Sequence, residues 1–345
     1  MLAARMYGKE DIRLEEVAKP AIGRGEILIK VKAAAICGTD VRMYRNGYKG
    51  ITEETPRILG HEFSGVIEEI ADGVAGYQVG QRVAVAPNMG CGICSYCVAG
   101  NGHLCHTYRA LGINLDGAFA EYVAIPAAAV SGGNVCVLDE RVSFEEAAIN
   151  EALSCVCNGF ERCAIRPGES VLVIGAGPIG IMHAMLAKMA GAAPVFIHDL
   201  SSERLQICRM IDPDFITIED HLKETIMEAT AGEGVNVCIT ACPSPAAQQT
   251  ALEITAVNGR VNFFGGIPAD KQKVALDTNL IHYKQLIVTG TTRASLTQYR
   301  NTLRFIATGI LDVKKLISRR MPLQDIMTGF ELAQKADGLK NVICM

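Results

Sequence analysis

Four cysteines within 15 residues form the densest group of potential metal ligands in the sequence. Between successive members lie two, two and seven residues; the four are Cys91, Cys94, Cys97 and Cys105. Thiolates at this spacing are typical of a closed tetrahedral zinc site, which is structural because no coordination position is left for a substrate. An iron–sulfur cluster is the alternative, since cysteine also ligates iron. We predict a structural zinc lobe at about residues 88–108.

A second set of potential ligands is scattered more widely along the chain. Cys37 stands in Cys-Gly-Thr-Asp, His61 and Glu62 stand in Gly-His-Glu, and Glu151 lies further on. A catalytic zinc needs about three protein ligands and one open position, and Cys37, His61 and a carboxylate would supply them. Each residue alone has a simpler interpretation: a hydrogen-bonded core histidine, a small buried cysteine, an exposed glutamate on a helix.

The chemistry of such a site would suit the oxidation of an alcohol. Hydride leaves an alcohol readily only after the hydroxyl proton has gone. Zinc lowers the pKa of a bound water from about 15.7 to about 7, and an alcohol oxygen in the open position should benefit similarly. The hydride then needs an acceptor, which is normally a nicotinamide cofactor.

A glycine-rich loop supplies the pattern expected for that cofactor. It follows the apolar run at 170–174, opens a helical pattern, and reads Gly175-Ala176-Gly177-Pro178-Ile179-Gly180. G-x-G-x-x-G in this setting binds a pyrophosphate at a helix N-terminus. Asp199 lies 19 residues after Gly180 and would accept hydrogen bonds from both ribose hydroxyls, which favours NAD; otherwise it caps the next helix. Arg204 could accommodate a 2′-phosphate, so NADP remains possible.

The elements that must position these residues fall into two kinds. Up to about residue 145 the apolar runs are short and separated by glycine turns, at 26–36, 65–70 and 81–86. From about 147, expected strands at 170–174, 194–198, 215–218, 235–240 and 260–265 alternate with helices. This alternation indicates an α/β fold with a doubly wound parallel sheet. We expect a β-rich catalytic domain at 1–146 and 290–345, and a nucleotide-binding domain at 147–289.

Composition excludes several other classes of function. The 345 residues are 49% hydrophobic and 20% charged, with a net charge of −4, so neither nucleic acid nor a membrane surface is an expected partner. No apolar run approaches the ~20 residues that span a bilayer. The 13 cysteines are odd in number and follow no export signal, so we expect reduced thiols and a cytoplasmic protein.

The order of these motifs carries a family resemblance. Cys-Gly-Thr-Asp, Gly-His-Glu, the four-cysteine segment and GAGPIG follow one another as in the zinc-containing medium-chain dehydrogenases, and the chain is most similar to their sorbitol (iditol) and threonine dehydrogenase branch. The resemblance covers essentially the whole length. It implies a GroES-like catalytic domain, a Rossmann cofactor domain, two zinc ions per chain, and NAD. It also implies a secondary alcohol substrate, a polyol, and a homodimer or homotetramer.

The same resemblance assigns roles to individual residues. Cys37, His61 and Glu62 would be zinc ligands, and Glu151 would be a ligand or would hold the zinc-bound water. Thr39 would pass the hydroxyl proton onward, and Asp40 would orient His61, as ligating histidines require. Further expected contacts are Gly265 and Thr291 with the cofactor, and Arg293 and Tyr44 with the substrate. Arg293 could equally be a solvated loop arginine.

Three positions depart from the branch, and alternatives follow from them. Ala152 stands where proline is usual after the glutamate, Arg42 where histidine is frequent, and Ala71 where glycine is frequent. The first two lie near the expected pocket, so they bear on the substrate rather than on the chemistry. A threonine-type dehydrogenase and a dehydrogenase of polyol phosphates such as galactitol 1-phosphate are the alternatives. An inactive nucleotide-binding homologue is a more remote one.

Overall fold

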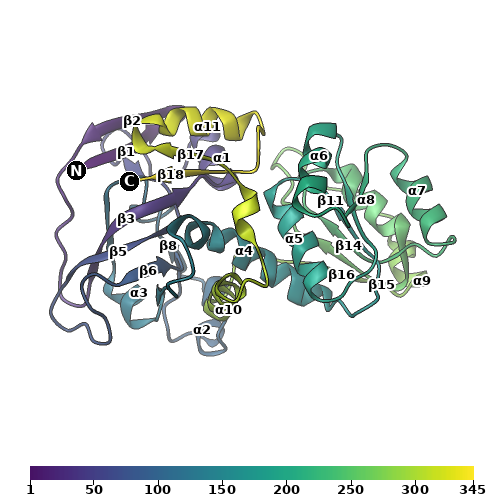
Figure 1. The fold of residues 1–345 in the computed structure, drawn as a ribbon, viewed down its shortest axis with the longest axis horizontal. Coiled ribbons are helices and arrows are strands. Elements are labelled where there is room, and N and C mark those ends of the chain that lie inside the picture. Colours follow the sequence, from purple (N-terminus) through teal and green to yellow (C-terminus); the bar gives the residue numbers. More distant parts are fainter. The chain divides into compact units, whose positions relative to one another are not determined.

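The computed structural model describes residues 1–345, which form two compact units. One unit comprises Met1–Ser154 and Arg293–Met345, and the other comprises Cys155–Thr292. Helix α4 (Phe144–Cys163) contains the point at which the chain passes from the first unit to the second (Figure 1). None of the helices has both the length and the apolar character needed to cross a membrane.

The first unit is built on a seven-stranded sheet that contains strands from both ends of the chain. Its order is β10-β6-β5-β3-β18-β17, and β9 also pairs with β3. The strands are β3 (Ile27–Ala35), β5 (Glu62–Ile70), β6 (Arg82–Val85), β9 (Tyr122–Ile125), β10 (Val135–Val137), β17 (Ile317–Pro322) and β18 (Lys340–Cys344). The last strand, β18, lies antiparallel to β3, so the C-terminal residues complete the sheet beside the metal-ligand motifs.

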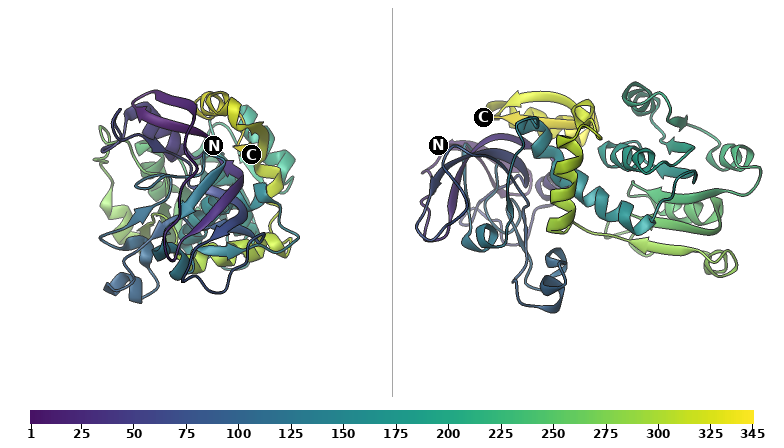
Figure 2. Two further views of the ribbon diagram at one scale, coloured as in Figure 1. Left: turned by 90° about the vertical axis from the view of Figure 1, so that its left-hand side faces the viewer. Right: turned by 60° about the horizontal axis from the view of Figure 1, so that its bottom comes forward.

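Smaller elements surround that sheet. The remaining strands of the unit are β1 (Leu2–Gly8), β2 (Asp11–Glu16), β4 (Arg57–Ile58), β7 (Asn88–Met89) and β8 (Arg109–Ala110). The helices are α1 (Gly38–Asn46), α2 (Ser95–Val98), α3 (Ala127–Ser131), α10 (Leu296–Ala307) and α11 (Ile326–Gln334), with 3-10 turns at Gly102–Leu104, Val313–Leu316 and Leu323–Asp325. The segment that carries α2 projects from the body of the unit (Figure 2).

The second unit is a six-stranded parallel sheet with the order β13-β12-β11-β14-β15-β16, which confirms the predicted doubly wound fold. Its strands are β11 (Val171–Ile174), β12 (Val195–His198), β13 (Ile216–Ile218), β14 (Val235–Thr240), β15 (Thr255–Phe263) and β16 (Ile287–Gly290). Its helices are α5 (Pro178–Met189), α6 (Ser202–Ile211), α7 (Leu222–Ala229), α8 (Pro245–Ile254) and α9 (Thr278–Tyr283). The strand order reverses between β11 and β14, which is where such sheets bind nucleotides.

One boundary differs from the sequence prediction. We expected a strand from residue 260, but β15 begins at Thr255, directly after α8 ends at Ile254. The cause is a bulge: Val235 pairs with Thr255, and the next paired residue, Val237, faces Arg260. The residues of β15 between Thr255 and Arg260 are not paired with β14, and the spacing of apolar residues in the sequence does not reveal such an interruption.

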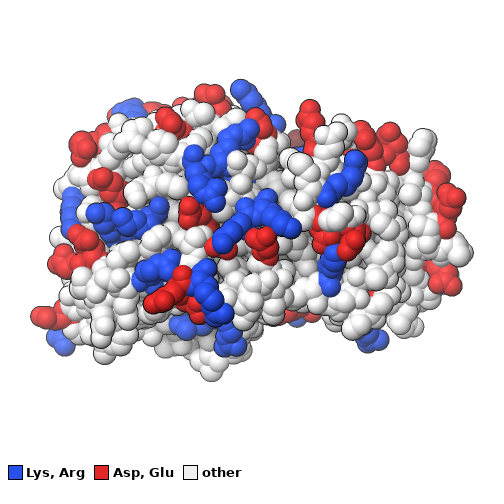
Figure 3. Space-filling view, in the orientation of Figure 1, with Lys and Arg blue, Asp and Glu red and all other residues white.

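Charged side chains are mixed in sign over the visible surface. In the space-filling view, acidic and basic side chains lie side by side, and the face shown has no continuous basic stripe (Figure 3). This distribution agrees with the small net charge of −4.

Candidate active site

Sheet register brings the scattered metal ligands together. Cys37 follows β3 and is the N-cap of α1, while Glu62 is the first residue of β5 and His61 precedes it. Strands β3 and β5 are antiparallel neighbours, and Ala35 pairs with Glu62, so the end of one strand meets the beginning of the other. The ligand atoms of Cys37, His61 and Glu62 lie within 4.8 Å of one another.

Asp40 holds two of these ligands from a fully buried position. Its Oδ2 accepts a hydrogen bond of 2.9 Å from the backbone N–H of Cys37, and its Oδ1 lies 3.3 Å from Nδ1 of His61. Burial lowers the pKa of His61, but the charges of Asp40 and Cys37 outweigh burial and raise that pKa well above its ordinary value. Surroundings that favour a proton on the imidazole also favour a metal cation beside it, so the donor set fits a zinc ion.

Glu62 has a partner that the sequence analysis did not identify. Nζ of Lys340, the first residue of β18, lies 2.6 Å and 2.5 Å from the two carboxylate oxygens of Glu62. Both side chains are almost completely buried. Burial lowers the pKa of Lys340, but Glu62 and, more weakly, Cys37 and Glu151 raise it overall, so the ammonium stays charged. The only signal in the sequence is a lysine at the start of the apolar run KNVIC.

Glu151 lies on α4 and is only 7% exposed, so its interpretation as an exposed helix residue is wrong. Its charge raises the pKa of Lys340 and also that of buried Tyr299, which places it within electrostatic reach of both. Glu151 does not belong to the close group of Cys37, His61 and Glu62. Three buried carboxylates, those of Asp40, Glu62 and Glu151, thus accompany one buried ammonium, that of Lys340.

The four clustered cysteines are arranged as a separate group. Their sulfur atoms all lie within 4.8 Å of one another, and Sγ of Cys94 is 3.5 Å from that of Cys97 and 3.7 Å from that of Cys105. With Zn–S bonds of ~2.3 Å, a tetrahedral site separates its sulfurs by about 3.8 Å. Such spacing has room for one ion and not for a cluster of several iron atoms. No disulfide joins any of them.

The glycine-rich loop leaves the centre of the parallel sheet of the second unit. Gly175 follows β11 with φ +114°, and a Cβ on Gly180 would stand 1.7 Å from the carbonyl oxygen of Gly175. Gly177 is the N-cap of α5, and Pro178 is its first residue. The loop is therefore tight because two positions accept only glycine, and the free amides of the α5 N-terminus suit a pyrophosphate.

Asp199 lies after β12 and bonds to this loop. Its Oδ2 accepts a 2.7 Å hydrogen bond from the backbone N–H of Ala176, and its Oδ1 accepts one of 2.9 Å from that of Ser201. Ser201, not Asp199, is the N-cap of α6. The carboxylate thus links the glycine loop to the next helix, and Nη1 of Arg204 lies 3.9 Å from it.

Comparison with known proteins agrees with both halves of this description. Residues 23–132 match the family model of the alcohol dehydrogenase GroES-like domain, and residues 178–308 match that of the zinc-binding dehydrogenases. An L-threonine 3-dehydrogenase from Idiomarina loihiensis is 32% identical over 95% of this chain and 94% of its own length. The chain belongs to the zinc-containing medium-chain dehydrogenases. It is an enzyme of the zinc-dependent alcohol dehydrogenase type.

Other members of the family show the same relationship. A sorbitol dehydrogenase from Bacillus subtilis is 32% identical over 96% of this chain and 93% of its own length. An alcohol dehydrogenase from Escherichia coli CFT073, solved with NADH, has a TM-score of 0.89 at 27% identity and covers 100% and 99% of the two chains. A zinc-binding dehydrogenase from Sinorhizobium meliloti 1021, solved with NADP, has a TM-score of 0.90 at 26% identity, with the same coverage.

Two further cofactor residues expected for this dehydrogenase lie at the carboxyl ends of strands in the second unit. Gly265 follows β15, its N–H donates to the carbonyl of Thr240 at 2.8 Å, and a Cβ there would lie 2.4 Å from the carbonyl oxygen of Cys242. Thr291 follows β16. The hydroxyl oxygens of Thr240 and Thr291 are buried without a hydrogen-bond partner. Unpartnered hydroxyls at this edge of the sheet are available to a polar ligand.

The residues expected near the substrate of this dehydrogenase have defined neighbours. Thr39, in the first turn of α1, accepts a hydrogen bond of 3.1 Å from Nη2 of the exposed Arg42. The ring of Tyr44 packs edge-on against Phe330 at 5.5 Å, and burial raises the pKa of Tyr44.

Arg293 interacts with the cysteine-rich segment. Its guanidinium carbon lies 3.8 Å from the ring centroid of Tyr108, and its Nη1 donates a 2.9 Å hydrogen bond to the carbonyl of His103. Arg293 is thus an exposed loop arginine, as the alternative interpretation has it, whose side chain also contacts the cysteine-rich segment.

Proposed function

We propose that this dehydrogenase transfers a hydride from a secondary alcohol, a polyol of the sorbitol type, to NAD and so produces a ketone. The single observation that carries the proposal is the close group formed by Cys37, His61 and Glu62, within 4.8 Å, in a chain that also carries the glycine-rich nucleotide loop. The similarity to a sorbitol dehydrogenase supports the choice of substrate.

Cys37, His61 and Glu62 would hold the catalytic zinc. A thiolate, an imidazole and a carboxylate suit zinc, and the ion lowers the pKa of a water or alcohol oxygen in its open position. Lys340 competes for the carboxylate of Glu62, since it already donates to both oxygens. We propose that Lys340 keeps Glu62 in place and offsets its charge, while Glu151 interacts with the water or substrate.

Thr39 would receive the proton of the substrate hydroxyl. Its Oγ1 already accepts a hydrogen bond from Arg42, and a guanidinium cannot accept a proton at any ordinary pH. The proton therefore cannot continue to Arg42, as it could to a histidine. We propose that it leaves through the cofactor ribose and solvent, while the positive charge of Arg42 stabilises negative charge that develops on the Thr39 oxygen.

Asp199 supports NAD as the cofactor. Each of its carboxylate oxygens already accepts one backbone N–H, and each retains a lone pair for a ribose hydroxyl. Its negative charge would repel a 2′-phosphate. Arg204, 3.9 Å away, weakens this repulsion, so both cofactors belong in the test.

L-Threonine is the second candidate substrate. The relative from Idiomarina loihiensis carries the name L-threonine 3-dehydrogenase and matches nearly the whole chain. Threonine resembles a polyol in having a secondary hydroxyl beside a second polar group, so the same proton and hydride chemistry would serve both.

A substrate panel with metal analysis tests the proposal. Sorbitol, other polyols, their phosphates and L-threonine are supplied with NAD or NADP, and reduction of the cofactor is followed by absorbance. We expect the highest kcat/KM with a free polyol and NAD, and two zinc ions per chain. Activity with threonine alone would replace the polyol by the second candidate, and one zinc per chain with no turnover would refute the proposal.

Cys37→Ser separates catalysis from folding. We expect this variant to lose turnover and one zinc, while NADH still binds, because the glycine loop lies in the other unit. Cys344→Ser is the matched control, since Cys344 is a partly buried cysteine outside both metal groups. Full activity in Cys37→Ser would remove Cys37 from the active site.

A further inference from the structure

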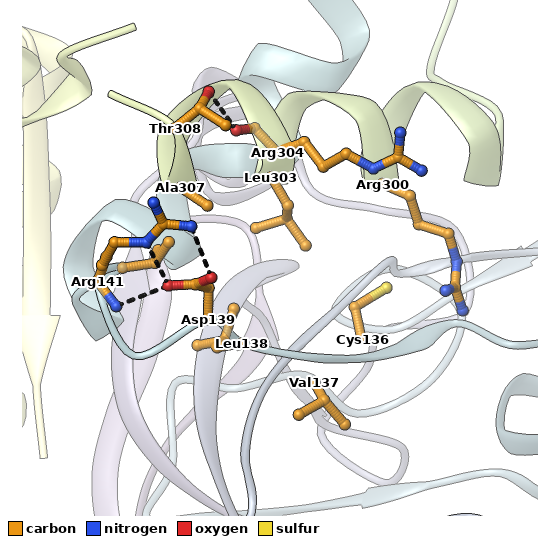
Figure 4. Close-up of a pocket in the computed structure, with 11 residues that line it drawn as sticks. Cys136, Val137, Leu138, Asp139, Arg141, Arg300, Leu303, Arg304, Ala307 and Thr308 are labelled. Atoms are coloured by element: carbon orange, nitrogen blue, oxygen red, sulfur yellow. Dashed lines mark hydrogen bonds and ion pairs between the residues drawn. The ribbon is translucent and has the colours of Figure 1, made fainter. Parts of the chain in front are cut away.

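A pocket of about 300 Å³ lies in the first unit, between one face of α10 and the stretch formed by β10 and the segment that follows it (Figure 4). It shares no residue with the two metal groups or with the expected substrate contacts. Its size is at the lower end of the range for small-molecule sites. The residues that matter for its chemistry are an apolar floor and three arginines.

The floor of the pocket is apolar and well packed. Leu138 and Val142 come from the segment after β10, and Leu303 comes from α10; their exposed fractions are 8%, 1% and 9%. The thiol of Cys136 lies beside them, and burial raises its pKa to about 11, so it is neutral at physiological pH. This surface suits a hydrocarbon or aromatic group rather than a second charge.

Three guanidinium groups surround this floor, but only one has a carboxylate partner. Arg141 is paired with Asp139 through two side-chain hydrogen bonds of 2.8 and 2.9 Å. Arg300 donates to the neutral carbonyl of Gly133, and Arg304 is exposed, with no carboxylate but Asp139 in the lining. Asp139 is the only acidic residue of the lining. Two positive charges are therefore not neutralised.

The positions of Arg300 and Arg304 suit a single anionic group. They are four residues apart on α10, so they leave the same side of the helix. Both line the pocket; in Figure 4 the side chain of Arg304 runs along α10 above Leu303, and that of Arg300 turns down on the side of Cys136. A guanidinium fork matches phosphate and carboxylate oxygens. The N–H groups of Arg304, and those of Arg300 that Gly133 does not use, match a phosphate monoester, which carries about −1.5 to −2 charges at pH 7.

We propose that this pocket binds a small organic phosphate, with its phosphate on Arg300 and Arg304 and a short apolar or aromatic body on Leu138, Val142 and Leu303. The apolar floor alone would not select a phosphate, because it carries no charge. The arginines alone would not select an organic phosphate, because they offer no surface for the apolar part of the ligand. The inference is independent of the substrate proposed above, since it concerns a different group of residues in the same unit.

Calorimetric titration of the zinc-loaded enzyme with phenyl phosphate tests the proposal. Saturating NAD is present throughout, so that the probe does not occupy the nucleotide site. We expect phenyl phosphate to bind about tenfold or more tightly than either inorganic phosphate or phenol, because each of these supplies only half of the contacts. Benzoate, with a single negative charge, should bind more weakly than phenyl phosphate.

The variant Arg304→Gln ties binding to the pocket. Arg304 is exposed on the helix and lies outside both metal groups, so the variant should keep the circular dichroism spectrum and activity of the parent. We expect about a tenfold loss of affinity for phenyl phosphate. Arg24→Gln is the matched control, because Arg24 is exposed in the same unit and does not line the pocket. Equal affinity in Arg304→Gln and the parent, or no binding of phenyl phosphate at about 10 mM, would overturn the proposal.

Discussion

Removal of the buried lysine beside the metal ligands should destabilise the first unit strongly. In Lys340→Met the carboxylate of Glu62, which is fully buried, loses a partner that lies 2.6 and 2.5 Å from its oxygens. At a charge separation of ~3 Å and an effective dielectric constant of ~20, the lost attraction is about 5 kcal/mol. Breaking a buried ion pair from one side costs about 3–5 kcal/mol. We therefore expect a loss of about 3–5 kcal/mol in the free energy of unfolding.

Urea unfolding measures this loss of stability, and a double-mutant cycle shows whether it comes from the Lys340–Glu62 ion pair. The chain has no tryptophan, so the transition is followed by far-UV circular dichroism. In Lys340→Met/Glu62→Gln neither charge remains, and the double variant should be more stable than Lys340→Met alone. Lys335→Met, at an exposed position of the same unit, is the control and should change stability by less than about 0.5 kcal/mol. A loss below about 1 kcal/mol in Lys340→Met, or additive effects in the double variant, would refute the reasoning.

Three further predictions concern other parts of the chain. His183 is buried, both its ring nitrogens lack partners, and burial lowers its pKa to about 3. Below about pH 6.5 the unfolded chain therefore binds a proton on His183 that the folded chain does not bind, so the free energy of unfolding falls by up to ~1.4 kcal/mol per pH unit between about pH 6 and 3. In His183→Leu this contribution to the fall should be absent, as urea unfolding at a series of pH values will measure. Cys97→Ser should lose one zinc per chain by elemental analysis and lower the melting temperature, without loss of the other zinc. Asp199→Ala should raise KM for NAD about tenfold and reduce the preference for NAD over NADP in steady-state assays.

The parallel sheet was predictable because its signals are local. Runs such as VLVI in β11 are apolar at every position, and the sheet buries them on both faces. The glycine loop follows directly in sequence, so a short stretch of chain contains the strand, the turn and the helix. The four cysteines are equally local. The start of β15 was missed because a bulge places residues outside the ladder without any change in hydrophobicity.

The surroundings of the other metal group could not be predicted in the same way. Cys37, His61 and Glu62 were singled out from short motifs, but Lys340 is 278 residues from Glu62. A lysine at the start of a strand normally projects into solvent, and only the pairing of β18 with β3 shows that this one is buried. The contacts of Arg293 with Tyr108 and His103 are also long-range, and no local pattern indicates them.

The position of β18 within its sheet has a consequence for the order of events during synthesis. Residues 155–292 form a continuous unit and can fold as soon as they leave the ribosome, but the other unit lacks an internal strand until β18 emerges. Until then Ala33–Ala35 of β3 lack a neighbour on that side, because β9 pairs only with Ile27–Lys30, and the carboxylate of Glu62 has no ammonium beside it. The nascent chain thus exposes a short apolar stretch of strand edge until β18 emerges, and a variant that lacks β18 would keep that stretch exposed.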